Sequence, residues 1–129
     1  MMTRNEQRSE FMRKIGMLCI IAKDKGINLM PFYFHRTRQE QILLYAKGRR
    51  GIDGEKIVTQ QDGIKNVSAH QNWLAMDLVI VSDDGYNLKW SSEKYKIVGE
   101  IWEDMGIGHI WGGRWTEPRD PYHFEMRGE

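Results

Sequence analysis

The chain has 129 residues, of which 40% are apolar, so it is long enough to bury a hydrophobic core as a single domain, residues 1–129. Its 19 lysines and arginines nearly balance 18 acidic residues, and a formal charge of +1 gives no overall field that would hold the protein on nucleic acid or on an anionic membrane. One cysteine, Cys19, excludes an internal disulfide and a cysteine-rich zinc site, so any metal must be bound through nitrogen and oxygen.

The first third of the chain predicts one helix and one short strand. Apolar residues recur at helical spacing and predict an amphipathic helix over about residues 3–24. A short extended segment follows over residues 27–34, and Pro31 within it favours a position at the edge of a sheet because proline cannot donate a backbone hydrogen bond.

The remaining elements alternate between helix and strand. Thr37 to Glu40 reads T-R-Q-E, a capping box that begins a helix ending near Gly48. The stretch A-M-D-L-V-I-V, residues 75–81, predicts a strand, and apolar residues over 97–105 predict a further helix. Because no parallel series of strand, helix and strand is evident, we predict an α+β fold with a small antiparallel sheet packed with helices.

The predicted strand carries a carboxylate although both of its faces are apolar. Side chains alternate along a strand, so Asp77 shares one face with Ala75 and Val79. A buried carboxylate needs a compensating cation, a metal ion or several hydrogen-bond donors. An arginine or the amides of a turn would meet this need, and the alternative is a metal ion shared with His70, seven positions earlier.

The segment D-P-Y-H-F-E near the end of the chain favours the metal. It supplies Asp120 and, three positions later, His123. Two histidines and an aspartate from two separate segments make the three-ligand set that catalytic zinc uses, with the fourth position left for water. A turn residue with a surface ion pair, next to Arg119, is the alternative role for Asp120.

Several blocks taken together resemble one enzyme family. S-A-H-Q-N-W-L-A-M-D, W-G-G-R-W and D-P-Y-H-F-E resemble the zinc-dependent peptidoglycan peptidases that include D-Ala-D-Ala carboxypeptidases, vancomycin-resistance dipeptidases and phage L-alanyl-D-glutamate endopeptidases, whose pattern is S-x-H-x-x-G-x-A-x-D and then D/E-x-x-H. F-H-R-T-R-Q-E-Q-I-L-L-Y-A-K-G-R resembles the arginine-bearing segment of the family, and K-I-V-T-Q-Q-D-G resembles the V-T segment of its endopeptidase branch. The blocks span about residues 28–126 in the family's order, and the resemblance implies a D-Ala-D-Ala peptidase/Hedgehog-like fold.

The resemblance implies a role for each matching residue. His70, Asp77 and His123 would bind Zn²⁺. Asp120 would act as the general acid/base, taking a proton from water and returning it to the leaving amine. Arg36 would donate to the substrate carbonyl or carboxylate and stabilise developing negative charge, with a solvated cation as the alternative.

Further residues are expected around this site. Ser68 matches the family serine and is expected to bind substrate or to support a ligand, unless it only caps a turn. Trp115 is expected to line the substrate groove or the core. Glu125 is expected to orient a zinc-bound histidine from behind or to face solvent. Arg114 follows paired glycines and could meet a carboxylate of an acidic peptide stem.

One position departs from the family pattern, because Trp73 stands where the family has glycine. Glycine permits a close turn or a left-handed backbone, so tryptophan implies either a relaxed turn or a bulky wall beside the metal. We expect metal binding to persist and substrate fit to change. The two other histidines, His35 and His109, are expected in the core or at the surface.

The resemblance implies a zinc metallopeptidase that hydrolyses the peptide stem of bacterial peptidoglycan. The V-T segment favours an L-alanyl-D-glutamate endopeptidase that acts as a phage or prophage endolysin; a D-Ala-D-Ala carboxypeptidase and a non-catalytic cell-wall-binding or virion module are the alternatives. We expect a monomer with no nucleic-acid partner and no stable membrane association. The sequence shows no signal peptide, so we expect synthesis in the host cytoplasm and action on periplasmic peptidoglycan after holin-type release.

Overall fold

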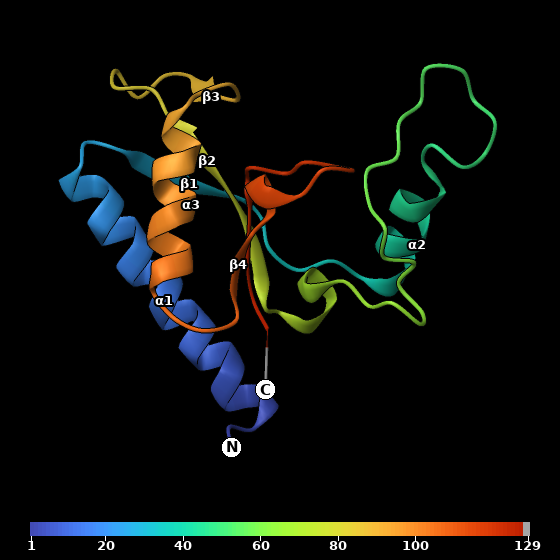
Figure 1. Cartoon of the computed structure of the whole chain (residues 1–129), viewed down its shortest axis with the longest axis horizontal. Helices are drawn as coiled ribbons and strands as arrows, with labels where there is room; N and C mark the ends of the chain where they lie inside the picture. Colours follow the sequence, from blue (N-terminus) through green and yellow to red (C-terminus); the bar gives the residue numbers. More distant parts are fainter. Residues whose placement is uncertain (128–129) are drawn as a thin grey trace.

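A single antiparallel sheet organises the computed structural model, which describes residues 1–127 (Figure 1). Four strands lie in the order β1-β2-β5-β4, and a short fifth strand pairs with the end of β2. The strands are β1 (Asn28–Tyr33), β2 (Ala75–Val81), β3 (Leu88–Lys89), β4 (His109–Trp111) and β5 (His123–Met126). All of their pairings are antiparallel, as the sequence predicts.

Three α-helices accompany the sheet. They are α1 (Arg4–Asp24), α2 (Arg38–Ala46) and α3 (Lys94–Asp104), and single turns of 3₁₀ helix lie at Ala69–Asn72 and Gly112–Arg114. The predicted capping box of α2 is present, because the Thr37 hydroxyl accepts from the Glu40 amide and the Glu40 carboxylate accepts from the Thr37 amide. None of the described helices is both long enough and apolar enough to cross a membrane.

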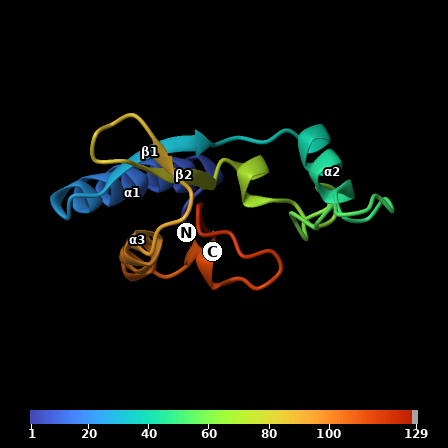
Figure 2. The same ribbon diagram turned by 90° about the horizontal axis from the view of Figure 1, so that it is seen from above.

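The hydrophobic core lies between one face of the sheet and the helices α1 and α3 (Figure 2). From the helices come Phe11, Ile15, Leu18, Ala22, Tyr95, Val98 and Trp102, and from the sheet come Met76, Leu78, Ile80, Trp111, Phe124 and Met126. Because side chains alternate along a strand, the residues between these on β2 and β5 must point to the opposite face. That opposite face therefore carries Asp77, His123 and Glu125.

Strand β1 lies at an edge of the sheet, as Pro31 predicts. Within the described chain β1 pairs with β2 alone, so the missing amide hydrogen of proline breaks no ladder hydrogen bond. The register shifts between Pro31 and Tyr33, which places Phe32 at an irregularity where its side chain is 55% exposed.

Helix α2 and the loop that follows it lie apart from the helical layer (Figure 1). Gln41 is the one residue of α2 that is buried. The loop residues K-G-R-R-G-I-D-G-E-K are mostly exposed, as a connection between elements is expected to be. Helix α2 and its loop are therefore joined to the rest of the fold mainly through the contacts of Gln41.

Trp73 keeps the left-handed backbone that the family glycine would adopt. Its φ is 62° and its ψ is 31°, so the expectation of a relaxed turn is wrong. The strain, about 1–2 kcal/mol for a residue with a Cβ atom, is offset by stacking, because the indole lies 3.8 Å from the His35 ring at an interplanar angle of 12°. The indole does not line the cavity described below, so the expectation of a wall beside the metal is also wrong.

A substitution at Gly99 on α3 would test how closely this helix packs on the sheet. A Cβ atom added there would lie 2.0 Å from Cδ2 of buried Trp111. We expect Gly99→Ala to lower the free energy of unfolding by about 2 kcal/mol, although alanine favours a helix more than glycine does. Urea denaturation would measure this change.

Gly16→Ala is the matched control, because Gly16 also lies within a helix and an added Cβ there would have no neighbour within 4 Å. This variant should be more stable than the parent by up to about 1 kcal/mol. Equal effects of the two substitutions would contradict the close contact between α3 and Trp111.

Candidate metal centre

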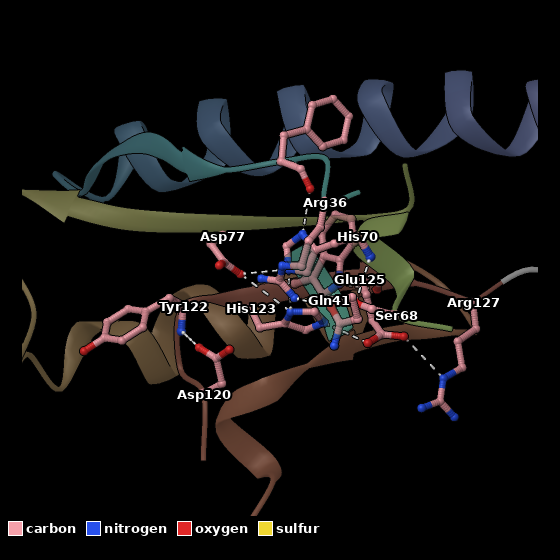
Figure 3. A network of polar contacts seen from close by, with 12 residues as sticks. Arg36, Gln41, Ser68, His70, Asp77, Asp120, Tyr122, His123, Glu125 and Arg127 are labelled. Carbon is pink, nitrogen blue, oxygen red and sulfur yellow. Dashed lines mark hydrogen bonds and ion pairs between the residues drawn. The ribbon is translucent and has the colours of Figure 1, made fainter. Parts of the chain in front are cut away.

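Three side chains from three elements converge on the open face of the sheet (Figure 3). Asp77 on β2 and His123 on β5 are direct partners in the antiparallel ladder. His70 approaches from the 3₁₀ turn, whose first amides are capped by Ser68: the hydroxyl accepts from the His70 amide at 3.2 Å. The S-x-H motif is thus a cap that directs the imidazole toward β2, and Ser68 takes the capping role that the sequence left open.

Hydrogen bonds on the outer side of each imidazole decide which nitrogen faces the centre. His70 Nδ1 donates to the Phe34 carbonyl at 2.7 Å, and His123 Nε2 donates to Glu125 Oε1 at 2.8 Å. When both rings are neutral, the inner nitrogens, His70 Nε2 and His123 Nδ1, therefore present lone pairs to each other at 3.2 Å. Glu125 occupies the position behind His123 that the sequence predicts, rather than facing solvent.

A metal ion fits these donors. Asp77 Oδ1 is buried without a hydrogen-bond partner, 3.2 Å from His70 Nε2 and 3.6 Å from His123 Nδ1. One ligand atom from each of the three residues lies within 4.8 Å of the others. In the neutral state of both rings, two nitrogen lone pairs and a carboxylate oxygen face one another with no hydrogen-bond donor between them, so a cation would stabilise the group. Two imidazole nitrogens and one carboxylate oxygen are a ligand set typical of zinc with an open fourth position.

The carboxylates around His123 favour positive charge at the centre. Burial would lower the pKa of His123, but its contacts with Asp77 and Glu125 outweigh burial and raise the pKa to about 9. Burial would likewise raise the pKa of Asp77, but the two histidines hold it well below its usual range. When no metal is bound, a proton on His123 can therefore take the place of the cation.

Asp120 lies in the turn before β5 with an altered proton affinity. Burial is the main cause that raises the pKa of its carboxyl, and the negative charge of Asp77 adds to it. Its amide donates to the Gly112 carbonyl at 3.0 Å, and a Cβ on Gly112 would lie 2.4 Å from the Asp120 carbonyl oxygen. The W-G-G segment thus permits the close approach that holds Asp120, and its partly buried carboxyl is no surface ion pair with Arg119.

Gln41 holds Arg36 at the edge of the site, a role that the sequence analysis missed. Arg36 Nη1 donates to Gln41 Oε1 at 2.8 Å, and the Gln41 amide donates to the Thr59 hydroxyl at 3.1 Å and to the Gln61 carbonyl at 2.8 Å. Gln41 is fully buried, and Arg36 Nε is buried without a partner. A glutamine directly before the apolar run I-L-L-Y-A of α2 was the available signal.

A cavity of about 1160 Å³ surrounds the three ligands. Arg36, Ser68, Asp120 and Trp115 line it, and the Trp115 ring lies 4.8 Å from the His123 ring. The sequence therefore identified a set of residues that the fold brings together. Tyr122 and Arg127, which also line the cavity, lie on opposite sides of the ligands (Figure 3), so the cavity continues past the centre in both directions.

Three other expected residues take structural roles. Arg114 reaches the cavity wall, but its guanidinium is paired with Glu103 through two contacts of 3.0 and 3.1 Å. His109 is buried against Trp102 in the core, at a ring distance of 4.2 Å. His35 stacks on Trp73, so neither of these histidines joins the metal centre.

Comparison with known proteins agrees with this site. Residues 62–126, half of the chain, match the model of a peptidase family described as D-alanyl-D-alanine carboxypeptidase. The matched segment contains all three ligands and Asp120. The chain belongs to this family. The expected family of peptidoglycan peptidases is thereby confirmed.

Two solved structures share this fold. One is a mutant of the vancomycin resistance D,D-pentapeptidase VanY from a VanB-type resistance cassette in complex with Zn(II): it is 19% identical, with a TM-score of 0.59 over 92% of this chain and 71% of that one. The other is VanYB in complex with D-alanine-D-alanine, with the same identity and TM-score over 92% of this chain and 70% of that one. The α+β fold is confirmed, and the zinc expectation agrees with the ligand set found here.

The protonation of His123 should couple zinc binding to proton release, and this coupling can be measured. With a pKa of about 9, His123 carries a proton at pH 7 that the incoming metal must displace. We expect Zn²⁺ binding at pH 7 to release about one proton per ion, and the apparent affinity to rise about tenfold per pH unit up to pH 9. Calorimetric titration in buffers of different ionisation enthalpy would count the protons.

Glu125→Gln is the matched variant for this measurement, because it keeps a hydrogen-bond acceptor behind His123 and removes the charge. It should lower the pKa of His123 and reduce proton release at pH 8. Zinc binding without proton release at pH 7 in the parent would show that Asp77 and Glu125 do not hold a proton on His123.

Proposed function

We propose that the chain is a zinc-dependent peptidase that cleaves the stem peptide of bacterial peptidoglycan between L-Ala and D-Glu. The observation that carries this proposal is the convergence of His70, Asp77 and His123 beside a carboxyl group, Asp120, whose pKa is raised. The family match supports stem-peptide cleavage, and the relatives of this fold that hold Zn(II) and D-alanine-D-alanine support both the metal and the substrate class.

Asp120 has the properties of the general acid/base. A bound zinc ion would supply Lewis acidity, which lowers the pKa of water and polarises an amide carbonyl. Asp120 is not one of the converging ligands, so its carboxylate is free to accept a proton from the attacking water. Because burial and Asp77 raise its proton affinity, it can hold that proton and deliver it to the leaving amine.

Arg36 supplies the positive charge that the reaction needs at the substrate oxygen. Its guanidinium lines the cavity, and its Nε has no partner within the described chain. Gln41 accepts a hydrogen bond from Nη1, so the charged guanidinium is held in a defined direction. A prearranged donor of this kind stabilises an oxyanion better than a mobile surface arginine would.

The shape of the cavity favours an internal bond over a terminal one. A carboxypeptidase needs room for a single residue on the leaving side, whereas an endopeptidase must pass the chain on both sides of the metal. The cavity extends from the ligands toward Tyr122 in one direction and toward Arg127 in the other. Thr59, from the V-T segment that resembles the endopeptidase branch, also holds Gln41.

We propose accordingly that the chain acts as a phage or prophage endolysin, made in the host cytoplasm and acting as a monomer on periplasmic peptidoglycan after holin-type release. The resemblance of K-I-V-T-Q-Q-D-G to the endopeptidase branch supports this role. The non-catalytic module is disfavoured, because a binding module needs neither an acid/base group nor an open metal position.

Mass spectrometry of the products tests the proposed bond. Zinc-loaded protein incubated with Gram-negative peptidoglycan should release stem peptides that lack L-Ala and begin at D-Glu, and a chelator should abolish their release. Loss of terminal D-Ala instead would identify the alternative D-Ala-D-Ala carboxypeptidase. No metal-dependent product at all would leave the non-catalytic wall-binding module as the function.

Two single variants separate metal binding from proton transfer. His123→Ala removes a ligand and should lose zinc and activity together. Asp120→Ala should retain about one zinc ion per chain, because Asp120 is no ligand, while turnover falls by at least about 100-fold. Zinc content by atomic absorption and rates on soluble muropeptides would check both. Full activity of Asp120→Ala would remove Asp120 from the mechanism.

A double-mutant cycle tests how Gln41 acts on Arg36. Gln41→Met keeps the side-chain volume and removes the hydrogen bonds, so Arg36 should lose its fixed direction and kcat should fall by about tenfold. In the Arg36→Ala background the same substitution should change kcat little, because the group that it positions is gone. Additive losses would show that Gln41 acts only through the stability of the loop at residues 59–61.

A further inference from the structure

Three aromatic side chains form a platform at one end of the cavity. Phe32 comes from the irregularity in β1, Trp90 follows β3, and Tyr122 directly precedes β5; all three line the cavity. Their rings pack edge to face, Phe32 with Trp90 at 4.9 Å and Trp90 with Tyr122 at 5.3 Å. The Tyr122 hydroxyl also donates to the Trp90 carbonyl, which fixes the platform to the strand that bears His123.

The platform leaves much of its aromatic surface in water. Phe32 is 55% exposed and Trp90 is 43% exposed. Clustered apolar surface of this kind in a cavity is typical of a binding site rather than of a structural contact. Since the platform adjoins the metal centre, its natural occupant is a part of the substrate.

A second, polar hollow begins where the platform ends. It has a volume of about 690 Å³ and shares Trp90 and Tyr122 with the main cavity. Its other lining side chains are mostly hydroxyl-bearing or charged: Lys89, Ser91, Ser92, Glu93, Lys94 and Arg119. A ligand that crosses the platform therefore meets hydrogen-bonding groups on the far side of the rings.

An aromatic surface bordered by hydrogen-bonding groups matches the chemistry of a pyranose sugar. Such a ring presents C–H bonds on its faces, which pack on the electron-rich face of an aromatic ring, and hydroxyl or acetamido groups at its edge. We propose that the platform and the polar hollow bind the glycan strand, with the amino sugar that carries the stem peptide on Trp90. This inference rests on the proposed peptidase function.

The spacing between the platform and the metal ligands agrees with the proposed bond. Tyr122 is adjacent to His123, and Phe32 is adjacent to Tyr33, the ladder partner of Asp77. Neighbouring positions in a sheet place the backbones of Phe32 and Tyr122 roughly 5–10 Å from those of the ligands, and Trp90 packs on both of their rings.

In the stem, cleavage between L-Ala and D-Glu leaves one amino acid between the scissile carbonyl and the sugar. Cleavage between the two terminal D-Ala residues leaves four, which span about 13 Å when extended. A sugar site this close to the metal centre therefore selects the bond nearest to the glycan.

Two substrates that differ only in the sugar test the inference. We would compare kcat/KM for GlcNAc-MurNAc-tetrapeptide with kcat/KM for the same tetrapeptide without sugar, capped by an acetyl group so that L-Ala keeps an amide nitrogen in both substrates. The parent protein should prefer the sugar-bearing substrate by at least about tenfold, and Trp90→Ala should abolish most of this preference, as expected for the loss of one stacking contact. Trp90→Phe should retain most of the preference, because phenylalanine keeps an aromatic face.

Tyr86→Ala is the control, because Tyr86 is 89% exposed and lies outside both hollows. It should leave the preference for sugar unchanged. A parent protein that uses both substrates equally would overturn the inference, as would a Trp90→Ala variant that loses rate on both substrates to the same extent.

A binding measurement separates this inference from the proposed function. Asp120→Ala protein should bind GlcNAc-MurNAc-tetrapeptide more tightly than the sugar-free tetrapeptide in calorimetry, and the added Trp90→Ala substitution should remove the difference. If neither substrate is cleaved by the parent while this difference persists, the peptidase function fails and the glycan site stands. Equal affinities for the two ligands would refute the glycan site even when cleavage occurs.

Discussion

Antiparallel pairing of β2 with β5 is the constraint on which the site depends. This pairing sets Asp77 directly beside His123 and turns both side chains away from the core that α1 and α3 cover. His70 completes the group from a capped turn, so its imidazole is placed by backbone hydrogen bonds rather than by packing. A shift of one residue in the β2–β5 register would turn Asp77 toward the core and separate the candidate ligands. The apolar face and the polar face of the sheet therefore depend on the same register.

Buried polar groups hold the site together, and nearly all of them have hydrogen-bond partners. Gln41 uses its amide for Arg36, Thr59 and Gln61, and Glu125 fixes His123 from behind. The exceptions are Asp77 Oδ1, which is assigned here to the metal, and Nε of Arg36, a residue that lines the cavity. Unsatisfied buried polar atoms are costly, so their position beside the cavity is itself evidence of function.

The residues that match the motif of the family lie at the metal centre, and the residue that departs from it lies elsewhere. Trp73 retains a glycine-like backbone and stacks on His35, so the departure from the family pattern lies outside the cavity. The cavity has an aromatic end and continues on both sides of the metal centre. In the function proposed here, the candidate ligands act in breaking the peptide bond, and the aromatic end of the cavity acts in recognising the peptidoglycan.

The sequence by itself predicted the three helices, the strands at 27–34 and 75–81 and, through the family resemblance, the three candidate ligands, because periodicity, capping boxes and motif spacing are local. Strand 75–81, both faces of that strand and the set of His70, Asp77 and His123 followed from such patterns. Only the tertiary structure decided the partners of Gln41, the pairing of Arg114 with Glu103 and the raised pKa of Asp120. Those properties depend on burial and on charges brought together from distant segments, and no local pattern encodes the distance between residues that meet only after folding.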